Sequence, residues 1–149
     1  MRELHVVDHY SIDCTTNETG KRDIQKFLTH IKSNNYDFII GLGIYSNKST
    51  IIKFEKFAKN KFRNEKIENA PDSFEISQFL KNDYDNPQIK ISYAMGNSWC
   101  NYSSFVIRNE LIKSNLKAKN GFIHIPNSPN QIQQYSHLIQ SEIIKLQRI

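Results

Sequence analysis

Apolar residues repeat along the chain with two different periods, and these periods predict an alternation of helices and strands. A first helix is expected to begin beside the capping residues Thr15 and Thr16, a second to run from about Trp99 to Leu116, and a third to begin near Pro129. The first helix has apolar residues at helical spacing: Ile24, Phe27, Leu28 and Ile31. Each of these segments therefore predicts an amphipathic helix with one buried face.

Short apolar runs between the helices predict strands. We expect strands at residues 4–7, 38–43, 51–57, 89–92 and 121–125. The run 38–43 is apolar on both faces and short, which is typical of a strand in the middle of a covered parallel sheet. Past Pro71 we predict a short helix with Phe74, Phe79 and Leu80 on its buried edge. The alternation as a whole predicts an α/β protein, a three-layer α/β/α sandwich with a mostly parallel sheet.

Composition narrows the class of protein. The 149 residues, 38% of them hydrophobic, are enough for one core, so we expect a single domain spanning 1–149. No run approaches the roughly 20 apolar residues of a membrane span, and no apolar leader follows Met1, so we expect a cytoplasmic protein that does not bind membranes. Two isolated cysteines predict neither a disulfide framework nor a zinc site, and no cofactor is expected.

The net charge of +5 comes from 20 basic and 15 acidic residues, a moderate excess that by itself names no partner. A basic run is the feature that favours nucleic-acid binding. It consists of Lys53, Lys56, Lys59, Lys61, Arg63 and Lys66. Because no nucleic-acid motif accompanies this run, we interpret it as a solvated face and expect no nucleic-acid partner.

Cys100 is a candidate nucleophile. It follows the predicted turn 94–98 and stands at the start of a predicted helix, where unpaired backbone N–H groups and the helix dipole favour a thiolate. The alternative is a small buried residue that fills the corner between strand and helix, because free cysteines are among the most buried residue types. Position alone leaves both interpretations open.

His124 and Glu55 are candidate partners of that thiol. His124 ends a predicted strand just before Pro126, so it is expected at the carboxyl edge of the sheet, where the turn before Cys100 should also lie. Glu55 stands among apolar neighbours, which is an unusual setting for a carboxylate without a partner. It could therefore orient an imidazole. The alternatives are a hydrogen-bonded histidine in a loop and a solvent-facing glutamate at a sheet edge.

Three motifs in the chain resemble those of the pyroglutamyl peptidase I (pyrrolidone-carboxylate peptidase) family. The segment 92–102, SYAMGNSWCNY, is similar to the family's cysteine signature, and 121–126, GFIHIP, to its histidine motif 24 residues after Cys100. The segment 54–60, FEKFAKN, is similar to the glutamate motif. The resemblance implies a phosphorylase/hydrolase-like fold and a Cys100–His124–Glu55 triad that removes N-terminal pyroglutamate from peptides.

The chain also departs from the family pattern. It begins at a point similar to the family's second strand, so we expect the first strand and its pocket-forming loop to be missing. The Gly-Arg pair that precedes the family's glutamate motif has at most Lys48 as a counterpart here. An absent leading strand would expose a sheet edge, and together with the resemblance this predicts a homo-oligomer.

These observations leave three functions open. The first is a cysteine exopeptidase that acts on pyroglutamyl peptides. The second is a cysteine amidohydrolase with another substrate, and the third is a catalytically impaired relative that acts as a binding module.

Overall fold

The computed structural model of the protein describes residues 8–45, 49–77 and 84–146. The chain falls into two compact units, Met1–Asn35 and Tyr36–Ile149. That residues 1–149 form a single domain stays a prediction.

The first unit contains one helix, α1 (Asn17–Lys32), and confirms the helix expected beside Thr15 and Thr16. Thr16 caps it: its hydroxyl oxygen accepts the N–H of Thr19 at 3.1 Å, and the Thr19 hydroxyl oxygen accepts the N–H of Thr16 at 3.3 Å. This reciprocal capping box fixes the start of the helix. The strand predicted at residues 4–7 lies outside the described residues.

The second unit is built on a four-stranded mixed sheet with the strand order β1-β6-β2-β5. Its strands are β1 (Phe38–Tyr45), β2 (Ile52–Glu55), β5 (Ile89–Ser92) and β6 (Lys119–Pro126). The pairs β1·β6 and β2·β5 are parallel, whereas the central pair β2·β6 is antiparallel. The sheet is thus mostly parallel, as predicted, but its two halves run in opposite directions. The interpretation of residues 38–43 as a middle strand was wrong, because β1 is at an edge of the sheet among the described residues and Leu42 is exposed.

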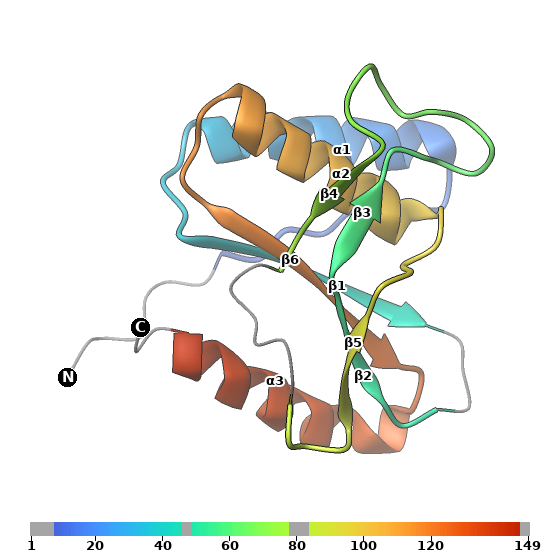
Figure 1. The fold of residues 1–149 in the computed structure, drawn as a ribbon, viewed down its shortest axis with the longest axis vertical. Helices are drawn as coiled ribbons and strands as arrows, with labels where there is room; N and C mark the ends of the chain where they lie inside the picture. Colours follow the sequence, from blue (N-terminus) through green and yellow to red (C-terminus); the bar gives the residue numbers. More distant parts are fainter. Residues whose placement is uncertain (1–7, 46–48, 78–83, 147–149) are drawn as a thin grey trace. The chain divides into compact units, whose positions relative to one another are not determined.

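Helices cover both faces of this sheet. The helices α2 (Trp99–Lys113) and α3 (Ile132–Leu146) lie on opposite faces, and α3 follows the short 3-10 helix η1 (Pro129–Gln131) (Figure 1). The core against α3 combines strand and helix residues: Ile52, Phe54, Ile89, Ile123, Tyr135 and Ile139. The predicted three-layer α/β/α arrangement is confirmed for this unit.

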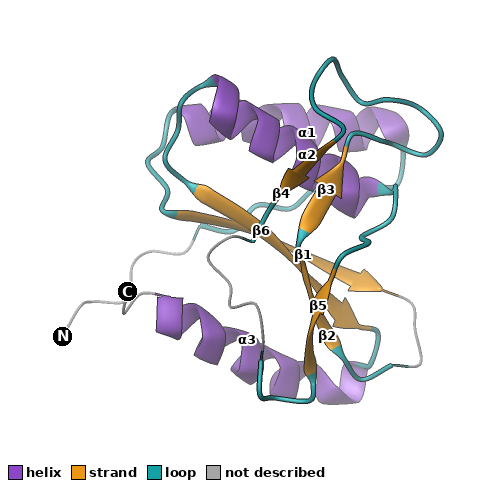
Figure 2. Cartoon of the chain, viewed as in Figure 1, coloured by secondary structure: helices purple, strands orange, loops and turns teal. Residues whose placement is uncertain are grey.

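A second, two-stranded sheet replaces the short helix predicted after Pro71. Strand β3 (Phe57–Lys59) pairs antiparallel with β4 (Ser73–Glu75), and a long loop joins them (Figure 2). The helix prediction was wrong at Phe74, because pairing with β3 and packing on Phe105 of α2, with ring centroids 4.9 Å apart, determine its backbone. Phe79 and Leu80 lie outside the described residues.

Strand alternation sorts the candidate residues onto one face of the main sheet. Phe54 and Ile123 belong to the core on the α3 face. The neighbouring residues Glu55, Phe122 and His124 therefore point to the other face, the one that α2 covers.

Candidate active site

The carboxylate of Glu55 binds the imidazole of His124. The two side chains come from the antiparallel pair β2·β6, and Glu55 Oε1 lies 2.7 Å from His124 Nδ1. Both residues are buried, with exposed fractions of 1% for Glu55 and 8% for His124. The alternatives left open by the sequence, a solvent-facing glutamate and a histidine in a loop, are therefore wrong.

Cys100 reaches the same place from α2. It is the second residue of that helix and is half-buried with a free thiol. Its thiol is close enough to the imidazole of His124 to raise the pKa of that group. Because Nδ1 of the imidazole faces Glu55, the nitrogen available to the sulfur is Nε2. The structure thus brings the three residues predicted from the sequence together.

The path of the chain from β5 to Cys100 differs from the one predicted. Strand β5, which precedes the turn before Cys100, runs parallel to β2 and therefore antiparallel to β6. The carboxyl ends of β5 and β6 consequently lie at different edges of the sheet. The segment 93–98 carries the chain across to the start of α2, where Gly96 has a φ of +94°.

The electrostatics of the pair favour a protonated histidine. Burial of the imidazole lowers the pKa of His124, but side-chain hydrogen bonds with Cys100 and Glu55, together with the charges of those groups, raise it from 6.5 to about 9. An imidazolium therefore predominates at neutral pH. A positive charge beside the sulfur stabilises the thiolate, which is the nucleophilic form of cysteine.

The start of α2 offers backbone donors next to Cys100. The N–H of Tyr102 donates to the carbonyl of Ser98 at 2.9 Å and closes the first turn, and the Ser98 side chain makes no capping hydrogen bond. The amides of Trp99, Cys100 and Asn101 precede that bond, so the helix itself gives them no acceptor. Such amides can stabilise a negatively charged oxygen beside the thiol.

Two glycines of β1 make room for the site. A β-carbon on Gly43 would lie 3.0 Å from Cys100 Sγ and 2.9 Å from Cζ of Phe122, and one on Gly41 would lie 2.4 Å from Cδ2 of Phe122. The Phe122 ring packs in turn on the His124 ring, with centroids 4.9 Å apart. The glycines thus leave room for the Phe122 ring and for the sulfur beside β1.

Asn101 anchors the start of α2 and has a role that the sequence analysis missed. Its side chain is fully buried, accepts the N–H of Lys59 at 2.7 Å, and donates to the carbonyls of Lys59 and Lys61 at 2.9 and 2.8 Å. These bonds tie the helix start, and with it Cys100, to the end of β3. The signal in the sequence was its place directly after the cysteine.

Asn60 organises the loop between β3 and β4 in a similar way. Its side-chain oxygen accepts the N–H groups of Ile67 and Glu68, and its side-chain nitrogen donates to the carbonyls of Glu68 and Ala70. This asparagine is the last residue of the glutamate motif. Its position in the motif is therefore explained by loop structure, not by contact with the thiol.

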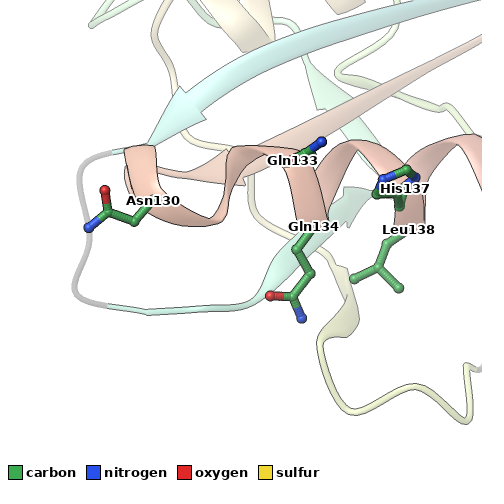
Figure 3. Close-up of a pocket in the computed structure, with 5 residues that line it drawn as sticks. All are labelled: Asn130, Gln133, Gln134, His137 and Leu138. Atoms are coloured by element: carbon green, nitrogen blue, oxygen red, sulfur yellow. The ribbon is translucent and has the colours of Figure 1, made fainter.

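Other features of the surface do not extend the site. A shallow hollow along η1 and α3 is lined by Asn130, Gln133, Gln134, His137 and Leu138, and none of the three candidate residues borders it (Figure 3).

Among the described residues, no group of three or more His, Cys, Asp or Glu side chains is placed to hold a metal ion. None of the helices described here is long and apolar enough to span a membrane. Lys48 lies outside the described residues.

Comparisons with known proteins found relatives by structure only. No protein-family model and no curated protein sequence matches the chain. The pyrrolidone carboxyl peptidase of Thermococcus litoralis is similar with 27% identity and a TM-score of 0.63, over 78% of this chain and 59% of that one.

Two further solved structures agree with this likeness. A mutant pyrrolidone carboxyl peptidase of Pyrococcus furiosus has 23% identity and a TM-score of 0.64, over 80% of this chain and 64% of that one. Pyroglutamyl peptidase I of Bacillus amyloliquefaciens has 22% identity and a TM-score of 0.64, over 75% and 61%. The chain spans less than two thirds of the length of each of these three relatives. It has the fold of the pyrrolidone carboxyl peptidases, also named pyroglutamyl peptidase I, and is a structural relative of that family.

Proposed function

We propose that the protein is a cysteine exopeptidase that removes N-terminal pyroglutamate from peptides, with Cys100 as nucleophile, His124 as acid and base, and Glu55 as the group that orients the imidazole. The observation that carries the proposal is the grouping of the side chains Glu55, His124 and Cys100, with 2.7 Å between Oε1 and Nδ1 and with the thiol close enough to the imidazole to raise its pKa. The likeness to solved pyrrolidone carboxyl peptidases supports the substrate class.

The proposed mechanism follows from the chemistry of these groups. The Cys100 thiolate attacks the carbonyl carbon of the pyroglutamyl residue, and the amides at the start of α2 stabilise the oxyanion that forms. The imidazolium of His124 then gives its Nε2 proton to the leaving nitrogen, which releases the shortened peptide and leaves a thioester. His124, now neutral, takes a proton from a water molecule, and the resulting attack frees pyroglutamate and restores the thiol.

Glu55 acts on the histidine and does not touch the substrate in this mechanism. Its carboxylate accepts the Nδ1–H of His124, which directs Nε2 toward the sulfur and stabilises the positive imidazolium. Glu55 Oε2 has no hydrogen-bond partner among the described residues. The carboxylate is therefore committed to the imidazole.

A chromogenic pyroglutamyl amide tests the proposal directly. The wild-type protein is expected to release the chromophore, and Cys100→Ala and His124→Ala are each expected to lower turnover by a factor of about 10³ or more. The variant Cys14→Ala is the matched control, because Cys14 is exposed and belongs to the other compact unit, Met1–Asn35. Turnover that survives both substitutions would contradict the triad.

The two alternative functions give different results in the same experiment. An amidohydrolase with another substrate would show no release of the chromophore but rapid alkylation of Cys100 with a low pH midpoint. A binding module would show neither. The geometry gives no observation that favours either alternative over the peptidase.

The proposal includes association of two copies through β1. This strand is an edge of the main sheet among the described residues, and its side chains Leu42 and Ile44 are 60% and 65% exposed on the α3 face. Edge strands of two identical chains can pair about a two-fold axis, which would bury both residues in each copy. Analytical ultracentrifugation should detect a dimer of the wild-type protein. The double variant Leu42→Lys, Ile44→Lys should be a monomer in the same experiment. A monomer at all concentrations would contradict it.

A further inference from the structure

One row of register partners, here called the register row, crosses the main sheet from the position beneath the thiol to two lysines. The row crosses the four strands in the order Gly43, His124, Lys53, Lys90, and register partners in a sheet point to the same face. Cys100 lies over the first position, with its sulfur 3.0 Å from the place of a β-carbon on Gly43. The imidazole and the side chains of two lysines therefore leave the sheet at successive positions beyond the thiol, on the α2 face.

The ammonium group of Lys53 is held near the imidazole. It lies 4.4 Å from the centre of the Tyr45 ring, and that ring stands edge-on to the His124 ring with centroids 5.9 Å apart. The Tyr45 hydroxyl donates to the carbonyl of Ile51, which fixes the ring across the start of β2. A lysine that stacks on such a ring keeps its charge at a defined place.

No carboxylate of the described residues forms an ion pair with either lysine. Glu55, two residues from Lys53 on the same face, is bound to His124 and buried. Lys53 is half-buried and Lys90 exposed. A half-buried cation beside the imidazole, with no counter-ion among the described residues, provides a binding position for an anion.

The proposed mechanism indicates which part of the substrate lies at this position. His124 hands its proton to the leaving nitrogen, so the leaving part of the peptide has to lie on the imidazole side of the thiol. The next positions of the row on that side are Lys53 and Lys90. A side chain that follows the scissile bond therefore meets the two lysines.

We propose that Lys53, assisted by Lys90, forms a subsite for an acidic side chain on the leaving side of the scissile bond, so that the preferred substrates are peptides with Asp or Glu directly after the reacting residue. This inference rests on the proposed function for its substrate. The cationic subsite itself depends only on the register row and the Tyr45 ring.

Alkylation of Cys100 tests the subsite without any turnover. Iodoacetate carries a carboxylate and iodoacetamide does not, so the ratio of their rates at Cys100, measured by mass spectrometry of the peptide that holds it, reports the local positive charge. The substitution Lys53→Gln is expected to lower this ratio about threefold at low salt, and Lys90→Gln to lower it less, because Lys90 is one strand further away and exposed.

Lys119→Gln is the matched control. Lys119 is exposed at the opposite end of β6, five residues and about 16 Å from His124, and its loss changes the net charge equally. The ratio is expected to stay at the wild-type value in this variant. A ratio in Lys53→Gln equal to that in Lys119→Gln overturns the proposal.

Peptide cleavage tests the substrate preference. Two peptides that differ only in having Glu or Gln directly after the pyroglutamyl residue are compared by kcat/KM. The wild-type protein is expected to favour Glu by a factor of about three to ten, Lys53→Gln to lose that preference, and Lys53→Glu to favour a peptide with Lys at that position. Cleavage without a preference for Glu overturns the proposal, whatever the alkylation ratio.

The two assays separate failure of this inference from failure of the proposed function. If no peptide is cleaved but the alkylation ratio falls in Lys53→Gln, the exopeptidase proposal fails and the cationic subsite stands. If peptides are cleaved without a preference for Glu, the subsite fails and the exopeptidase stands.

Discussion

Gly43 lies directly beneath Cys100: a β-carbon at position 43 would come within 3.0 Å of the sulfur. The contact joins an outer strand of the sheet to the first turn of α2, two elements more than 50 residues apart in the sequence. The absence of a side chain at position 43 therefore helps to set the height of the thiol above the sheet and its distance from the imidazole.

Gly43→Ala is expected to slow turnover and Cys100 alkylation more than it lowers stability. The added methyl group displaces the sulfur by a few tenths of an ångström and crowds Phe122, at a cost of about 1 kcal/mol of unfolding free energy. Catalysis is more sensitive than folding to such a displacement, so a loss of turnover of about tenfold or more is expected. Denaturant unfolding and kcat/KM measured on the same samples check this.

Gly41→Ala is the matched comparison for that prediction. Its methyl group would meet Phe122 at 2.4 Å, whereas Cys100 is not among its nearest neighbours. Gly41→Ala is expected to lower the unfolding free energy more than Gly43→Ala does, by about 1–3 kcal/mol. For each kcal/mol of stability lost, it should slow the alkylation of Cys100 less than Gly43→Ala does. The reverse order would contradict the positioning role of Gly43.

The imidazole of His124 is expected to titrate near pH 9. NMR of the ring protons should place its midpoint well above the ordinary 6.5, because the hydrogen bonds with Cys100 and Glu55 outweigh burial. Cys100→Ala removes the thiol and Glu55→Gln replaces the charged acceptor by a neutral one, so each should lower the midpoint. A midpoint at or below 6.5 in the wild-type protein would contradict the geometry.

The same raised pKa has a consequence for stability. The folded protein holds the His124 proton more tightly than the unfolded chain, so this contribution is complete below about pH 6.5 and is lost as pH rises through about 9. The unfolding free energy should therefore fall between these values, and it should fall less steeply in His124→Ala. Urea unfolding at a series of pH values measures both slopes.

Glu55→Gln should reduce turnover strongly while the fold persists. An amide can still bind Nδ1, but it neither carries the charge that stabilises the imidazolium nor fixes one orientation of the ring, so kcat is expected to fall by about 10²–10⁴. The exposed residue Glu65 offers a control, because Glu65→Gln makes the same chemical change at an exposed position. Equal turnover in the two variants would remove Glu55 from the mechanism.

Asn101→Ala should loosen the start of α2. It leaves the N–H of Lys59 and the carbonyls of Lys59 and Lys61 without their partner, at a cost of about 3 kcal/mol. Ser103→Ala, on the same helix turn, removes one bond to the helix's own backbone and is expected to cost less than 1 kcal/mol. Thermal unfolding compares the two, and equal losses would contradict the anchoring role of Asn101.

Local patterns in the sequence were sufficient for much of the fold. The segment 89–92 was predicted as a strand and is β5 with those bounds, and the helix predicted from Trp99 is α2, which ends at Lys113. These elements follow from spacing and capping within a few residues, so a single sequence contains the information. The prediction at Phe74 failed, because its conformation depends on β3 and α2, which are distant in the sequence.

The candidate site shows the same division between near and distant information. Its residue types and their motifs were visible in the sequence, and so was the placement of Cys100 at the start of a helix. The sequence did not contain the register that sets His124 beside Lys53, nor the closeness of Gly43 to the sulfur. Both depend on which strands pair and in which direction.

By itself the sequence determined the α/β class, most of its helices and strands, and three residues able to work together as a thiol, an imidazole and a carboxylate. Only the tertiary structure decided that β2 runs antiparallel to β6, that Glu55 and His124 are buried 2.7 Å apart, and that two lysines continue the row beyond the imidazole. The physical reason is the range of the interactions. Helix and strand propensities act over a few neighbouring residues, whereas strand pairing and burial join residues whose separation along the chain leaves no local trace.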